Sequence, residues 1–130
     1  MIIEEYLNSK KDTKFSWAEN NCLSFVVEYL DLDELPLEWF LGHDNEVQCY
    51  RAYKKKLREL RYSDIVDAFD DILQAEVTLW PRDGFIVATP ASGLVGKVFG
   101  LHYKNRNFFL DMDGLKSLPA SPHDLYWSID

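Results

Sequence analysis

Cys22 is the residue whose type and position suit chemistry best. It follows two asparagines in the stretch FSWAENNCLSF, residues 15–25, and opens an apolar pattern of helical spacing. A thiol at a helix N-terminus feels the positive end of the helix dipole, which lowers its pKa. With a base to take its proton, such a thiol can act as a nucleophile in acyl transfer. The same position suits a small buried residue, because free cysteine is among the most buried residue types.

Three histidines could supply that base, and none has a spacing that pairs it with Cys22. His43 lies in an acidic loop, His102 follows a predicted strand, and His123 lies near the C-terminus. Cys49 has no motif around it and is predicted to be a core residue. The cysteines form no CxxC pair and the histidines lack zinc-ligand spacing. We therefore predict no metal, no cofactor and no disulfide framework.

The elements that must position Cys22 begin with helices. Up to about residue 75 the apolar residues have helical spacing, which predicts helices over 2–9, from Asn20 or Asn21 onward, over 46–61, and after a Ser63 cap. Asparagine and serine are strong N-caps because their side-chain oxygens accept from free backbone N–H groups. The side chains predicted to face the core are Ile2, Ile3, Tyr6, Leu7, Leu23, Val26, Val27, Leu30, Val47, Tyr50, Leu57, Leu60, Ile65, Val66, Phe69, Ile72 and Leu73.

The second half of the chain has the pattern of strands. Apolar residues alternate or run in short blocks between turn signals, which predicts strands over 76–80, 84–89, 94–100, 107–112 and 126–129. Helices followed by an antiparallel meander indicate an α+β fold with the helices packed on one face of the sheet. The length suits one domain over residues 1–130. The large aromatics Trp17, Trp80 and Trp127 are predicted in the core or at its rim.

The charge distribution narrows the classes of partner. The net charge is −8; seven acids lie between Glu28 and Glu46 without a base, and five more lie between Asp64 and Glu76. Such a surface repels a nucleic-acid backbone, so nucleic acid is not expected as a ligand. The clusters are interpreted as solvated helix faces, with a docking surface for a basic partner as the alternative.

Nothing in the sequence suggests membrane insertion. No apolar run reaches the ~18 residues that a membrane span needs. The start, MIIEEYLNSKKD, carries acids where a signal peptide would carry bases. We therefore expect a chain without a signal peptide that stays in the cytoplasm or is released by lysis or assembly.

Five short motifs follow one another between residues 15 and 129: FSWAENNC, WPRDGFIVA, GLVGKVFG, NFFLDMDGLKSLP and YWSI. In this order they resemble a small phage- and prophage-associated family without an assigned function. Its members carry an F-x-W-G-x-x-D-C start and an N-G-L…L-P…A-W-x-I end. That family is itself similar to the NlpC/p60 superfamily of papain-like cysteine hydrolases. The resemblance implies an NlpC/p60-like, papain-like core over the single domain.

The resemblance also implies roles for individual residues. In NlpC/p60 enzymes the nucleophilic cysteine begins a helix packed against the sheet, and the catalytic histidine opens a later strand. Cys22 matches the cysteine, whereas the histidine position holds Leu94, the aspartate before the cysteine is Asn21, and a glycine is replaced by Ala18. Leucine cannot accept a proton, and acid–base help is typically worth ~100 to 10,000-fold in rate.

Three functions remain open at this point. The missing histidine favours a non-catalytic virion protein, a pseudoenzyme that serves as a tail-associated assembly or adaptor module beside other phage structural proteins. The first alternative is a cysteine hydrolase, a peptidase or amidase with Cys22 as nucleophile and an unconventional base. The second is an acidic phage protein that binds and inhibits a basic host factor. The expected location is the virion or the host cytoplasm.

Overall fold

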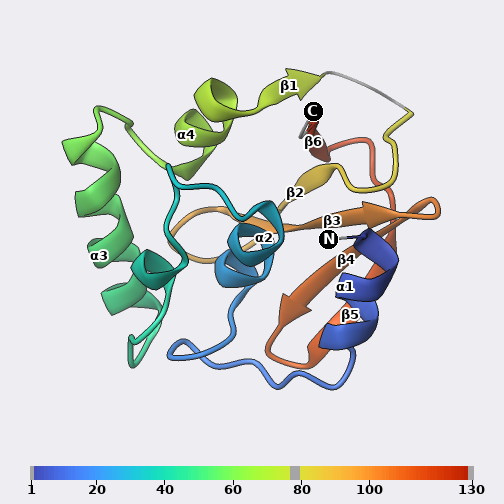
Figure 1. The fold of residues 1–130 in the computed structure, drawn as a ribbon, viewed down its shortest axis with the longest axis horizontal. Helices are drawn as coiled ribbons and strands as arrows, with labels where there is room; N and C mark the ends of the chain where they lie inside the picture. Colours follow the sequence, from blue (N-terminus) through green and yellow to red (C-terminus); the bar gives the residue numbers. More distant parts are fainter. Residues whose placement is uncertain (1, 77–79, 129–130) are drawn as a thin grey trace.

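The computed structural model describes residues 2–76 and 80–128, with helices in the first half of the chain and a sheet in the second (Figure 1). The helices are α1 Ile3–Lys10, α2 Cys22–Leu30, the 3-10 helix η1 Leu37–Phe40, α3 Glu46–Glu59 and α4 Ile65–Ile72. The strands are β1 Gln74–Glu76, β2 Ile86–Pro90, β3 Lys97–Tyr103, β4 Arg106–Asp111, β5 Gly114–Pro119 and β6 Leu125–Ser128. The α+β class predicted from the sequence is confirmed. No described helix combines the length and apolar character that a membrane crossing requires.

Side-chain caps start α2, α3 and α4, whereas α1 and η1 begin without one. The side-chain oxygen of Asn21 accepts from two backbone N–H groups of the first turn of α2, at 3.1 and 2.9 Å. The backbone N–H of Asn21 donates to the Ser24 hydroxyl at 2.8 Å. This reciprocal arrangement is a capping box, and it confirms the predicted start of α2. Asp64 caps α4 by accepting from the N–H of Asp67 at 2.9 Å. The predicted cap, Ser63, is therefore wrong by one residue. Serine and aspartate can both cap a helix, so the sequence pattern alone does not decide between these two neighbouring positions.

The strands form one six-stranded sheet in the order β1-β6-β2-β3-β4-β5, and every neighbouring pair is antiparallel. The meander from β2 to β5 follows the chain, whereas β6 lies between β1 and β2, with Trp127 opposite both Ala75 and Ile86. The strand β5 was not predicted; it owes its conformation to pairing with β4. Residues 77–79 and 129 of the predicted strands lie outside the described residues.

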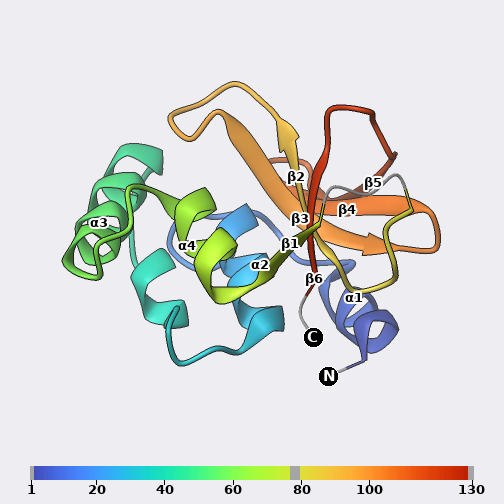
Figure 2. The same ribbon diagram turned by 90° about the horizontal axis from the view of Figure 1, so that it is seen from above.

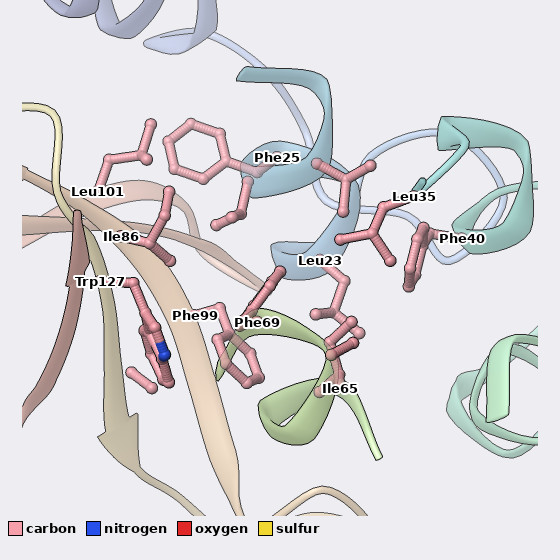
Figure 3. Close-up of a cluster of buried hydrophobic side chains, with 14 of the residues drawn as sticks. Leu23, Phe25, Leu35, Phe40, Ile65, Phe69, Ile86, Phe99, Leu101 and Trp127 are labelled. Carbon is pink, nitrogen blue, oxygen red and sulfur yellow. The ribbon is translucent and has the colours of Figure 1, made fainter. Parts of the chain in front are cut away.

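The main core lies between the sheet and the helices α2 and α4 (Figures 2 and 3). Phe69 of α4 meets Phe99 of β3 edge-on, with ring centroids 5.4 Å apart. Trp127 is fully buried in this core and Trp17 packs against it, as predicted. Trp80 is 84% exposed, so its predicted place in the core is wrong.

The helix α3 differs from its prediction in the face that it buries. Its buried residues are Cys49, Tyr53 and Leu57, while Val47 and Leu60 are 44% and 47% exposed. The reason is tertiary, because α3 packs chiefly against η1 and α4 at one end of the molecule (Figure 2). The predicted inward residues of α1, α2 and α4 are mostly buried.

Candidate functional site around Cys22

Cys22 is the first residue of α2, as predicted, and its side chain is half-buried. The fully buried Asn21 before it also donates from its side-chain nitrogen to the backbone carbonyl of Phe40 in η1, at 2.7 Å. An aspartate in this place would keep the helix cap but would have no N–H to donate. The asparagine therefore ties α2 to η1 in a way that an aspartate could not.

The Cys22 pocket, a cavity of about 40 Å³, lies beside the sulfur between α2, α3 and the start of β3. Its lining residues are Trp17, Cys22, Leu23, Glu46, Tyr50, Tyr53, Ser92, Gly93, Val95, Lys97 and Phe99. Glu46, Tyr50 and Tyr53 have the i, i+4, i+7 spacing of one helix face. A cavity of this size holds about one or two water-sized groups, so it does not accommodate a peptide without rearrangement.

The thiol in this pocket is held in its neutral form. Burial raises the pKa of Cys22 to about 11. Backbone hydrogen-bond donors at Phe99 and Leu23 lower this pKa, and the Glu46 carboxylate raises it. Desolvation therefore outweighs the helix N-terminus, because removing a thiolate from water disfavours its charge. Cys22 is a protonated thiol at neutral pH and a weak nucleophile.

Leu94 does not face the sulfur, which corrects the position expected from the resemblance. It lies in the loop before β3, is 48% exposed, and does not line the Cys22 pocket. The β3 residues that line the pocket are Lys97 and Phe99. Side chains alternate between the two faces of a strand, so odd-numbered positions of β3 point toward Cys22 and even-numbered ones point away. The strand also begins three residues later than predicted.

None of the three histidines lines the Cys22 pocket. His43 lies before α3, with its Nε2 atom 3.2 Å from a backbone carbonyl. His102 is buried on the opposite face of the sheet, where its Nδ1 atom lies 2.7 Å from the side-chain oxygen of Asn107. It lies within β3 rather than after it, contrary to the prediction. His123 is exposed in the segment before β6.

Two further groups near the sulfur, the Cys49 thiol and the Tyr53 hydroxyl, are buried. Cys49 is fully buried, as predicted, its sulfur lies 3.7 Å from the Phe40 carbonyl, and burial raises the pKa of the thiol to about 12. The hydroxyl of Tyr53 is buried and makes no hydrogen bond within the described part of the chain. Burial likewise raises the pKa of this phenol, so it stays protonated. The pocket thus places two neutral thiol and phenol groups near the charged Glu46 and Lys97, and its lining contains no imidazole.

The sequence reasoning found Cys22 and missed the residues that surround it. The spacing of Glu46, Tyr50 and Tyr53 was a usable signal, whereas Lys97 could be placed only once the start of β3 was known. Among the described residues, no three His, Cys, Asp or Glu side chains gather closely enough to hold a metal ion.

Comparisons of the chain with models of protein families, with curated proteins and with solved structures found no match. The arrangement around Cys22 is therefore the basis on which a function can be argued. It consists of a neutral thiol at a capped helix start, a very small pocket, and no histidine in its lining.

Proposed function

We propose that this chain is a non-catalytic virion protein of a phage or prophage, a tail-associated assembly or adaptor module on a degenerate NlpC/p60-like fold. The order of motifs from residue 15 to residue 129 is what suggests the phage context. The α+β architecture, with Cys22 at the start of a helix that lies across an antiparallel sheet, is compatible with the proposed fold.

One observation carries the non-catalytic part of the proposal. The pKa of the Cys22 thiol is raised to about 11, and no histidine lies in its pocket. Covalent catalysis by cysteine needs either a lowered thiol pKa or an adjacent base to remove the proton. With a raised pKa and no histidine beside it, Cys22 serves as a small packing residue between α2 and β3.

The proposal is tested with Cys22→Ala in the phage or prophage that encodes the chain. We expect the variant to be incorporated into particles, detected by mass spectrometry of purified virions, and to support the wild-type yield of infectious particles. Cys49→Ala is the matched control, because it removes a second buried thiol that does not correspond to the nucleophilic cysteine of NlpC/p60 enzymes. Both variants are first compared with the wild type by urea denaturation, so that loss of folding is recognised.

Two results would overturn the proposal. If purified virions contain no trace of the chain, the assembly role is wrong. If Cys22→Ala folds and assembles but abolishes infectivity, while Cys49→Ala does not, the thiol has a chemical role and the cysteine hydrolase becomes the better interpretation.

A further inference from the structure

The solvent-exposed side of α3 is strongly basic on a chain that is acidic overall. Four cations, Arg51, Lys54, Lys55 and Arg58, line a groove along it, and we call them the basic face. All except Lys54 are exposed, and Lys54 donates to the hydroxyl of Tyr50 at 2.6 Å. The chain as a whole has a net charge of −8.

The four cations of the basic face form no ion pair within the described part of the chain, although one acid, Glu59, also lines the groove. In the described residues the ion pairs are Lys10 with Glu28 and Lys116 with Asp111, and neither involves α3. Lys54 and Arg58 are four residues apart on one helix face, and like charges at this spacing repel each other and destabilise the helix. The basic face therefore does not stabilise its own helix and is available to an anionic partner.

A complementary surface exists on the same chain. Glu28, Asp31, Asp33 and Glu38 line a groove between the end of α2 and η1, and we call them the acidic groove. Asp31, Asp33 and Glu38 are exposed and form no ion pair in the described part of the chain. Its apolar lining includes Leu32 and Leu35. The groove thus offers carboxylates around a partly apolar floor.

Within the residues that the structure describes, the two surfaces form no ion pair with each other. The helix α3 packs its buried side against η1, whereas the basic face lies on its solvent-exposed side (Figures 1 and 2). The attraction between the two surfaces is thus unsatisfied within one copy and can be satisfied between two copies. A contact between different surfaces of identical chains is heterologous, and repetition builds either a closed ring or an open chain.

We infer that copies of this chain associate head to tail, with the basic face of one copy bound in the acidic groove of the next. A nucleic acid fits the observations less well, because the net charge of −8 repels a polyanion. The inference goes beyond the proposed function and does not depend on it, since self-association can be measured without a virion.

The test uses the purified full chain, freed of nucleic acid, in sedimentation equilibrium at low and high salt. At about 20 mM salt, where screening is weak, the average mass should rise with concentration above the 15.2 kDa of one chain. At about 500 mM salt, where the Debye length falls to roughly 4 Å, the mass should return toward that of the monomer.

Charge reversals locate the contact. Lys54→Glu with Lys55→Glu should abolish association, and so should Asp33→Lys with Glu38→Lys. A mixture of these two double variants should associate as a 1:1 dimer, because the unchanged basic face of one variant meets the unchanged acidic groove of the other. Each reversal changes the net charge by two, so starting from −8 the variants carry −12 and −4. Both remain acidic, and attraction between net charges cannot explain recovery in the mixture.

Two further variants complete the design. The chain with all four substitutions keeps the native net charge but has lost the charge of both surfaces, so it should stay monomeric. Lys11→Glu with Lys14→Glu is the matched control, because it also carries −12 but alters neither surface, and it should associate like the wild type. A wild type that stays monomeric at low salt, a mixture that does not recover, or binding through Lys54 and Lys55 to heparin without self-association would each overturn the inference.

Discussion

Alkylation of Cys22 by iodoacetamide is expected to be slow at neutral pH and to accelerate with every pH unit up to about pH 10. Burial raises the pKa of this thiol from 9.0 to about 11. Two pH units correspond to about a hundredfold smaller thiolate fraction at neutral pH, and the thiolate is the reacting species. The half-buried position of the sulfur slows the reagent further.

The assay uses the Cys49→Ala variant, so that Cys22 is the sole thiol, and follows alkylation by mass spectrometry from pH 6 to pH 10. The same variant unfolded in urea is the reference, since it has the same thiol without the fold. We expect the folded protein to react at least about 100-fold more slowly than the unfolded chain near pH 7. Circular dichroism at each pH confirms that the protein remains folded.

An inflection of the folded-state rate at or below about pH 7.5 would refute this reasoning, because it is the range of activated cysteines. So would a folded-state rate equal to or above that of the unfolded chain. Either result would mean that the helix N-terminus outweighs desolvation at the sulfur. The hydrolase interpretation would then replace the packing role.

Three other predictions concern stability, each measured by urea denaturation. Cys22→Ala should lower the free energy of unfolding by about 1 kcal/mol, as small core truncations do. The wild type should lose stability between pH 9 and about pH 11, because folding raises the pKa of Cys22 and the folded state therefore favours the protonated thiol. Cys22→Ala should lose less stability over the same pH range. Asn21→Ala should cost about 2 to 4 kcal/mol, and Asn21→Ser about 1 kcal/mol less because serine keeps the cap but not the bond to Phe40; equal costs would show that the cap is dispensable. Gly100→Ala should cost about 1 to 3 kcal/mol or more, because its Cβ would lie 2.2 Å from the carbonyl oxygen of Phe108, and a stable variant would contradict this packing.

Local signals placed the helices well. The Asn21 cap, with an apolar stripe behind it, determines the start of α2 through bonds that span only three residues. That start places Cys22 at the helix N-terminus in any fold that keeps the helix. The change of period near residue 75 likewise predicted the α+β class, because periodicity reports which side of each element meets the core.

The surroundings of the sulfur could not be obtained in this way. Strand register decides which residues of β3 point toward Cys22, and it gives this face to the odd-numbered positions Lys97 and Phe99. Leu94 lies outside the strand, in the loop before it, and is exposed. Pairing of β3 with its neighbours sets this register, and it depends on residues far apart in the sequence.

The sequence by itself determined where a thiol meets a helix N-terminus, because capping and helical periodicity act over one or two turns. Only the tertiary structure decided that the thiol stays protonated. The pKa of Cys22 depends on how completely α3 and β3 cover the sulfur, and Glu46 and Phe99 reach it from segments 24 and 77 residues away. Desolvation is a property of the packed interior, and no local pattern encodes it.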